Sequence, residues 1–201
     1  MTIFHLLRHG EHGLAGRVLV GRMPGVGLSE RGRGDVEAVA QRFAHEEIDA
    51  LYASPLQRTR ETAEIIGRRL DLPIGFRHDL LEIDFGEWTG STFDAIRDHP
   101  NWPLWSQHRS IAKVPGGETM RQVQRRIVEA LMELHQSHPD EIVLLVSHGD
   151  VIRAALVFAL GMPLDLYGRL EISLASVSTI RLDGSGIRVL GMNEQPALRQ
   201  R

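Results

Sequence analysis

Ile142-Val143-Leu144-Leu145-Val146 is a run of five residues in which every side chain is apolar. Strands covered by helices on both faces of a parallel sheet have such continuous runs, whereas half-exposed strands alternate apolar and polar residues. The segment that follows, residues 151–160, has the spacing of apolar residues that is typical of a helix. The run therefore predicts a central parallel strand of an α/β protein.

Strands and helices alternate in the rest of the chain as well. Ser54-Pro55-Leu56-Gln57 has the pattern of a helix cap, and Ser29 and Thr119 stand before segments whose apolar residues recur at helical spacing. The predicted elements are strands at residues 3–7 and 51–53, helices that follow Ser29, Ser54 and Thr119, and two or three strands within residues 171–193. This order predicts a three-layer α/β/α sandwich with a mostly parallel central sheet.

The segment from residue 82 to 114 interrupts this alternation. It contains all three tryptophans, Trp88, Trp102 and Trp105, together with several glycines and prolines. Loop-rich excursions of this kind often cover an active site. We therefore expect one domain over residues 1–201, with residues 82–114 as a lid.

Composition narrows the class of protein. The 201 residues carry a formal charge of −3, so no overall positive field favours nucleic acid, and the absence of cysteine excludes disulfides and thiolate chemistry. No apolar run is long enough to cross a membrane, and the N-terminal apolar run meets Arg8 too early for a signal peptide. These features favour a cytoplasmic protein that binds a small molecule, and neither nucleic acid nor membrane. They leave the oligomeric state, including a homodimer, open.

Two histidine–glycine pairs follow predicted strands. His9-Gly10 comes after residues 3–7, and His148-Gly149 comes after residues 142–146. Ligands bind beyond the carboxyl ends of strands in open α/β sheets, and a glycine lets the backbone come close to a ligand. If the two strands are neighbours, both histidines face one site.

Two arginines are expected at the same edge of the sheet. Arg8 precedes the first of these histidines, and Arg58 lies in the first turn of the helix that follows residues 51–53. Arginine grips phosphate oxygens bidentately through its planar guanidinium group. The pair therefore predicts a clamp for a phosphate group.

Five blocks of the sequence together resemble the histidine phosphatase superfamily, which has the phosphoglycerate-mutase-like fold. They occur in the family's order and extend from residue 8 to about residue 155. The blocks are Arg8-His9-Gly10-Glu11, Ser54-Pro55-Leu56-Gln57-Arg58-Thr59, Leu80-Leu81-Glu82-Ile83-Asp84-Phe85-Gly86-Glu87-Trp88, Pro115-Gly116-Gly117-Glu118-Thr119 and Ser147-His148-Gly149.

The resemblance implies an enzyme without metal or cofactor, in which His9 is the nucleophile and becomes phosphohistidine. It implies that Arg8, Arg58 and His148 hold the phosphoryl group and that Glu82 protonates the leaving oxygen. These roles agree with general chemistry, because imidazole is neutral near pH 7 and fixed cationic donors stabilise the charge of a transferring phosphoryl group.

Other carboxylates compete with Glu82 for the role of the acid. They are Glu11, Asp84 and Glu87, and the position relative to the turn at residues 84–86 favours Glu82. Glu118 is interpreted as a carboxylate that stabilises a helix N-terminus.

The residues after the first histidine depart from the family's pattern. His12 stands where the family commonly has a small hydroxyl residue, and the Asn that lines the family's pocket is missing. Arg17 and Arg22 are therefore either substitute substrate ligands or solvated charges. The seven histidines outside these motifs, at positions 5, 45, 78, 99, 108, 135 and 138, are interpreted as surface residues. The candidates for substrate binding are Arg8, Arg58, His148, Gly149, Arg17, Gly21 and Arg22.

The sequence favours hydrolysis of a phosphomonoester. The family's phosphoglycerate mutases carry an extended basic insertion after the acid, whereas residues 88–114 contain three cationic side chains, Arg97, Arg109 and Lys113, and no Arg-Arg pair. Trp102 and Trp105 favour a larger or less charged leaving group. A phosphoglycerate-type phosphomutase stays as the alternative, because residues 21–26 resemble bacterial members called probable phosphomutases.

Two further classes are weaker hypotheses. A metallohydrolase using His9 and His12 would lack the helical pair of histidines four residues apart, and two arginines would repel its cation. A binding module without catalysis is disfavoured, because both histidines, both arginines and the acid are present together.

Overall fold

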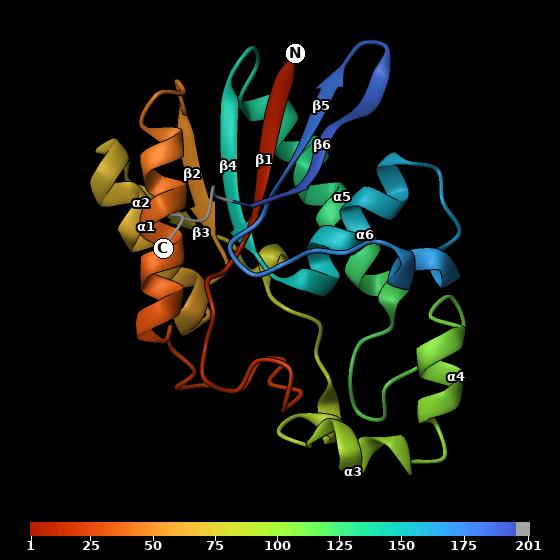
Figure 1. Ribbon diagram of the computed structural model, residues 1–201. Helices are drawn as coiled ribbons and strands as arrows, with labels where there is room; N and C mark the ends of the chain where they lie inside the picture. Colours follow the sequence, from red (N-terminus) through yellow and green to blue (C-terminus); the bar gives the residue numbers. More distant parts are fainter. Residues whose placement is uncertain (196–201) are drawn as a thin grey trace.

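The computed structural model describes residues 1–195, which form a six-stranded sheet in the order β3-β2-β4-β1-β5-β6 (Figure 1). Neighbours among the first four strands of this order are parallel, and β5 and β6 pair antiparallel at one edge. The strands are β1 (Thr2–Arg8), β2 (Ala50–Ala53), β3 (Ile74–Phe76), β4 (Ile142–Ser147), β5 (Val177–Asp183) and β6 (Gly186–Glu194). The mostly parallel sheet and the hairpin near the C-terminus confirm the sequence predictions.

Helices cover both faces of the sheet (Figure 1). The pair α1 and α2 lies on one face, and the pair α5 and α6 lies on the other. The long helices are α1 (Glu30–Phe43), α2 (Gln57–Leu70), α5 (Met120–Ser137) and α6 (Gly149–Ala159). The shorter ones are α3 (Phe93–Arg97) and α4 (Trp102–Gln107), and the 3-10 turns are η1 (His78–Leu80), η2 (Gly86–Trp88) and η3 (Leu164–Arg169). No helix in this part of the chain combines the length and the apolar composition that a membrane crossing requires.

Strand β4 shows why a continuous apolar run was the informative signal. Val143 and Leu145 belong to the core under α5 and α6, whereas Leu144 and Val146 belong to the core under α1 and α2. All four side chains are fully buried, because successive strand residues point to opposite faces. Burying each such side chain stabilises the fold by about 1.5–3 kcal/mol.

Side-chain caps form at two of the three predicted helix starts. Ser29 accepts a hydrogen bond from the backbone of Gly32 at the start of α1, and Thr119 forms a reciprocal capping box with Gln122 at the start of α5. The cap at Ser54 was wrong: α2 begins at Gln57 without a side-chain cap. The hydroxyl of Ser54 instead lies 2.8 Å from a ring nitrogen of His148, as described below.

His5 is buried, which corrects its interpretation as a surface residue. It is 6% exposed on β1, with Nδ1 3.0 Å from the hydroxyl of Thr179 and Nε2 3.1 Å from a carboxylate oxygen of Glu46. The physical reason is the central position of β1, whose side chains are covered on both faces.

Residues 82–114 form the loop-rich excursion that the sequence predicted, containing η2, α3 and α4. In Figure 1 they lie beyond the carboxyl ends of β1 and β4. Trp88 and Trp105 are buried, with their ring centroids 6.0 Å apart in an edge-to-face arrangement. That the excursion acts as a lid stays a prediction.

Candidate active site

The central strands bring the two histidine motifs together. Arg8 and Ser147 are register partners in the parallel β1–β4 pair, and the backbone N–H of His9 donates to the carbonyl of Ser147 at 3.1 Å. Strand β2 lies on the other side of β4, so that the N–H of Ser54 donates to Val146 at 3.0 Å. The carboxyl ends of β2, β4 and β1 therefore deliver their following residues to one place.

The ring of His9 is held as a neutral base with a defined tautomer. Its Nδ1 lies 2.8 Å from the carbonyl oxygen of Gly10, and a carbonyl only accepts, so Nδ1 carries the proton. The lone pair then resides on Nε2, which faces Arg58. Burial, with the charges of Arg58 and Arg8, holds the pKa of His9 well below its usual value. An unprotonated Nε2 in a cationic surrounding is suited to attack a phosphorus atom.

Arg58 stands at the centre of the site and is 1% exposed. Its Nε lies 3.3 Å from Nε2 of His9, and its Nη2 donates to the carbonyl of Gly21 at 2.7 Å. Its Nη1 is buried and has no hydrogen-bond partner among the described residues. Burial lowers the pKa of Arg58 to about 10, so the group stays cationic at neutral pH. Gly21, a candidate ligand, thus orients Arg58 through its backbone.

His148 lies beside His9, with the ring centroids 5.2 Å apart. Its Nδ1 is 3.2 Å from Nη2 of Arg58, which only donates, so Nδ1 accepts and Nε2 carries the proton toward Ser54. Burial, followed by the charge of Arg58, lowers the pKa of His148 well below its usual value. Arg58 therefore fixes the tautomer of His148, and the hydroxyl of Ser54 accepts from its Nε2, a role that the interpretation as a helix cap missed.

Arg8 completes the cationic cluster. Its Nη1 donates to the carbonyl of Ile172 at 2.5 Å, and its Nε is buried without a partner among the described residues. Gly149 lies directly against this guanidinium group, because a Cβ atom there would be 3.2 Å from Cζ of Arg8. Gly10 has a different function from the one expected: a Cβ atom there would lie 2.7 Å from both the carbonyl oxygen of Gly32 and the side chain of Val36. Its small size serves packing against α1.

Glu82 lies on the wall of the site with a perturbed ionisation. Burial, with the negative charge of Asp150, raises the pKa of its carboxyl group to about 7 against the opposing effect of Arg58. Its Oε1 accepts a hydrogen bond from the N–H of Ile83 at 3.0 Å. A carboxyl group with this pKa can both give and take a proton near neutral pH.

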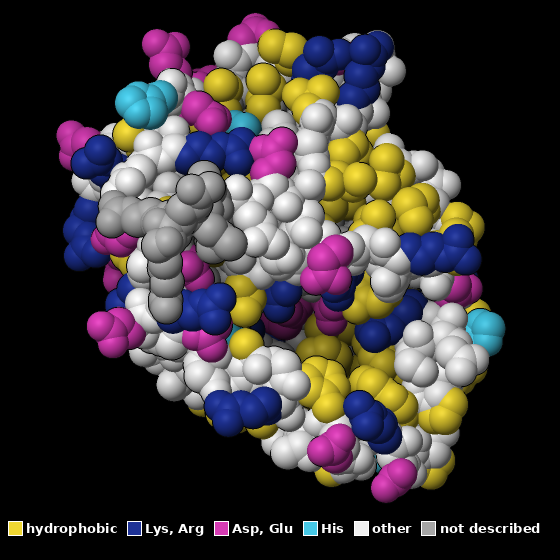
Figure 2. Space-filling model, viewed as in Figure 1, with side chains coloured by type: hydrophobic (Ala, Val, Ile, Leu, Met, Phe, Trp, Pro, Cys, Tyr) yellow, Lys and Arg dark blue, Asp and Glu magenta, His cyan; other side chains and the backbone are white. Residues whose placement is uncertain are grey.

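A cavity of about 220 Å³ is lined by Arg8, Glu82 and Gly149 among others. Figure 2 shows a hollow in this face, with charged side chains in its depth and hydrophobic side chains along its wall. Its charged lining comprises Arg8, Glu82, Arg109, Asp150 and Arg153, and its aromatic lining comprises Phe85, Phe93, Trp102, Trp105 and Tyr167. His9, Arg58 and His148 lie buried behind this lining, and the ring of His12, which does line the cavity, is centred 5.4 Å from that of His9.

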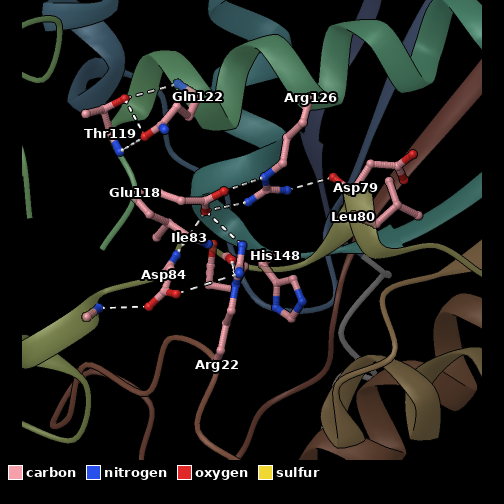
Figure 3. Close-up of polar contacts among 12 residues, drawn as sticks. Arg22, Asp79, Leu80, Ile83, Asp84, Glu118, Thr119, Gln122, Arg126 and His148 are labelled. Atoms are coloured by element: carbon pink, nitrogen blue, oxygen red, sulfur yellow. Dashed lines mark hydrogen bonds and ion pairs between the residues drawn. The ribbon is translucent and has the colours of Figure 1, made fainter. Parts of the chain in front are cut away.

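The structure brings neither Arg17 nor Arg22 into the cavity lining. Arg17 is exposed and bonds to the carbonyl of Gly13 in its own loop. Arg22 is turned toward Glu118 and the backbone of Glu82 (Figure 3). Their expected contact with substrate is therefore not supported, because each guanidinium group already has a protein partner.

Asp150, Tyr167 and Arg109 are among the lining residues of the cavity that were not identified from the sequence as parts of a site. Tyr167 donates to Asp150 at 2.6 Å, and the guanidinium group of Arg109 lies 4.6 Å from the centroid of the Tyr167 ring. The place of Asp150 directly after the His148-Gly149 pair was the one signal that could have indicated it. Tyr167 lies in η3 and Arg109 in the loop after α4, and only the fold brings them together.

Comparison with known proteins connects this geometry to a family. The profile described as "Histidine phosphatase superfamily (branch 1)" matches residues 4–195. Phosphoserine phosphatase 1 of Hydrogenobacter thermophilus is 30% identical over 179 residues, which are 87% of this chain and 85% of that protein. Bifunctional protein Rv2228c of Mycobacterium tuberculosis is 36% identical over 184 residues, and the chain spans 50% of its length. The solved structure of mycobacterial glucosyl-3-phosphoglycerate phosphatase Rv2419c with VO3 has a TM-score of 0.86 at 29% identity, covering 96% of this chain and 99% of that one.

Proposed function

The chain belongs to the histidine phosphatase superfamily, branch 1, and we propose that it hydrolyses small phosphomonoesters by passing the phosphoryl group first to His9 and then to water. The family and the relatives named as phosphatases support hydrolysis of phosphomonoesters. The geometry of the site supports the roles that we propose for single residues. The decisive observation is that Nε of Arg8 and Nη1 of Arg58 are buried donors without a partner among the described residues, beside the neutral ring of His9. Buried unpaired donors are costly, and phosphoryl oxygens satisfy them.

The first half-reaction transfers the phosphoryl group to the enzyme. Nε2 of His9 attacks phosphorus and forms a P–N bond while the bond from phosphorus to the leaving oxygen breaks. Arg8 and Arg58 donate to the phosphoryl oxygens, whose charge they stabilise during transfer, while His148 lies beside the attacking ring of His9. Glu82, protonated below its pKa of about 7, gives its proton to the leaving oxygen, so an alcohol departs.

The second half-reaction returns the enzyme to its starting state. Glu82 is now a carboxylate and takes a proton from water as the water oxygen attacks phosphorus. The P–N bond breaks, inorganic phosphate forms, and His9 regains its lone pair. One carboxyl group thus serves as acid and then as base.

The position of Arg109 on the cavity wall favours a leaving group with a negative charge. Its guanidinium group lies 4.1 Å from the centroid of the Trp105 ring and 4.6 Å from that of Tyr167, and it has no acidic partner among the described residues. A cation held between two aromatic rings on the cavity wall favours an anion on the substrate. Phosphoserine and glucosyl-3-phosphoglycerate, named in two of the relatives, each carry a carboxylate besides the phosphate. We therefore propose leaving groups with a carboxylate, in place of the less charged ones expected from the sequence.

Arg109→Gln is expected to lower kcat/KM for phosphoserine about 10- to 100-fold, the effect of losing one hydrogen bond to a charged group. The matched substrate is phosphoethanolamine, which lacks only the carboxylate and is expected to change by less than about threefold. Arg97→Gln, an exposed charge on the same excursion, serves as the control variant. Equal losses with both substrates would show that Arg109 shapes the pocket through its aromatic stack and binds no carboxylate.

Hydrolysis and isomerisation are separated by one assay. The protein is supplied with 3-phosphoglycerate and a trace of the bisphosphate, and inorganic phosphate and the 2-isomer are both measured. We expect phosphate to accumulate at the rate of substrate loss. Net formation of the isomer without phosphate would overturn the proposal in favour of a mutase.

A further inference from the structure

The segment that carries Glu82 belongs to no strand and no α-helix. Residues 81–85 connect η1 to η2, so their backbone groups lack the regular partners that a sheet or helix provides. Side chains from other elements bond to this segment and to the turn before it. The contacts are Arg126 Nη1 to the carbonyl of Asp79 at 2.6 Å, Ser147 Oγ to that of Leu80 at 2.9 Å, Arg22 Nε to that of Glu82 at 2.9 Å, and the N–H of Asp84 to Glu118 Oε2 at 3.1 Å.

Glu118 joins these contacts into one network (Figure 3). Its Oε2 accepts from Nη2 of Arg22 at 2.9 Å and from Nη2 of Arg126 at 3.2 Å, and its Oε1 accepts from Nε of Arg126 at 3.2 Å. Arg126 donates to the carbonyl of Asp79, three residues before the proposed acid, and Arg22 donates to the carbonyl of Glu82, the proposed acid itself. Glu118 therefore bonds to both arginines whose side chains hold the carbonyls of Asp79 and Glu82.

The side chains of the network are largely shielded from water. The side chains of Glu118, Arg126 and Arg22 are 20%, 16% and 31% exposed. Charge-assisted hydrogen bonds that are shielded from water are stronger and shorter than neutral ones. Glu118 also precedes Thr119, the actual cap of α5, so its carboxylate is committed to the arginines and not to the helix N-terminus.

We propose that Glu118, acting through Arg22 and Arg126, is a positioning residue for the proton donor Glu82. This proposal rests on the proposed role of Glu82 as general acid. Proton transfer requires a carboxyl oxygen within about 2.6–3.2 Å of the leaving oxygen, and a displacement of about 1 Å can reduce a rate by about 100-fold. Without Glu118, Arg126 loses its anionic partner, Arg22 keeps only the longer 3.8 Å contact with Asp84, and the N–H of Asp84 loses its acceptor. The segment then relaxes while the phosphate clamp of Arg8 and Arg58 stays intact.

The test compares two substrates in Glu118→Gln. With phosphoserine, whose leaving alkoxide needs a proton, kcat/KM is expected to fall about 10- to 100-fold. With p-nitrophenyl phosphate, whose leaving phenolate is a weak base, the fall is expected to stay within about threefold. Glu61→Gln is the matched control, because Glu61 is 15% exposed and likewise joins a backbone N–H, that of Leu28, to an arginine, Arg33. Glu61→Gln should change kcat/KM for the two substrates to the same extent.

A double variant distinguishes failure of this proposal from failure of the proposed function. In a Glu82→Gln background, Glu118→Gln is expected to cause no further loss with phosphoserine, because the acid it positions is already absent. If Glu82→Gln itself shows no difference between the substrates, the role of Glu82 fails. Two results would overturn the positioning role if Glu82→Gln does show the difference. One is an equal fall in kcat/KM for both substrates in Glu118→Gln, and the other is that Glu118→Gln adds its full loss in the double variant.

Arg22→Gln provides a second variant should Glu118→Gln fold poorly. Arg22 is the more exposed arm of the network, and its loss removes the bond to the carbonyl of Glu82. The same selective loss with phosphoserine is expected, with an unfolding temperature close to that of the wild type. An equal loss with both substrates would again contradict the proposal.

Discussion

His9→Ala is expected to abolish turnover, with a fall of at least about 10⁴-fold in kcat for every phosphomonoester, because the nucleophile of a covalent mechanism has no substitute in the site. The variant removes a buried ring whose Nε2 faces Arg58, and leaves Arg8 and Arg58 in place to bind phosphate. Substrate binding is therefore expected to persist while chemistry is lost. The measurement is phosphate release under saturating substrate, beside equilibrium binding of inorganic phosphate.

The phosphoenzyme gives the same prediction an independent readout. Wild-type protein quenched during turnover of labelled substrate is expected to carry phosphate that is labile in acid and stable in alkali, as a P–N bond is, and His9→Ala is expected to carry none. His45→Ala, at an exposed position on the surface, is the control and should label normally. An acid-stable label, or a label retained in His9→Ala, would contradict the assignment of the nucleophile.

Glu82→Gln is expected to slow phosphorylation of the enzyme by phosphoserine by about 10²–10⁴-fold, the usual contribution of general acid catalysis. Glutamine keeps the size of the side chain but cannot deliver a proton to an alkoxide. p-Nitrophenolate leaves without that proton, so the first step with p-nitrophenyl phosphate should suffer much less. The variant is then expected to accumulate phosphohistidine and to show a burst, because the water that attacks in the second step has lost its base.

The pH profile follows from the raised pKa of Glu82. The acid works while it is protonated, so kcat/KM for phosphoserine is expected to fall as pH rises through about 7, approaching tenfold per pH unit above it. With p-nitrophenyl phosphate this fall at alkaline pH, the alkaline limb of the profile, should be weak. In Glu82→Gln the limb should disappear, leaving a low rate that does not depend on pH in this range.

Equal slowing of both substrates' first steps in Glu82→Gln would show that Glu82 serves binding or folding. Asp84, Glu11 and Glu87 are then the carboxylates to replace in the same way. The geometry argues for Glu82, since it lines the cavity whereas the carboxylate of Asp84 is held by the N–H of Gly86 and lies 3.8 Å from Arg22.

The sequence by itself determined the layers, the central strands, the long helices and the edge of the sheet at which the two histidine motifs lie, but not the short edge strand β3. These follow from local patterns, such as the apolar run of β4 and the capping box at Thr119, which act over a few residues. The placement of His9 and His148 required only that β1 and β4 be neighbours, which they are.

Only the tertiary structure decided which side chains serve substrate and which serve the protein. Arg22 looked like a loop charge that could reach substrate, but its partners Glu82 and Glu118 lie 60 and 96 residues away in the sequence. The guanidinium group of Arg58 and the carbonyl of Gly10 fix the tautomers of His148 and His9, and Arg109 packs on Tyr167 from a separate loop. Periodicity reports which face of an element is buried, whereas a polar side chain chooses its partner by distance and direction after the elements have packed, so these contacts left no pattern in the sequence.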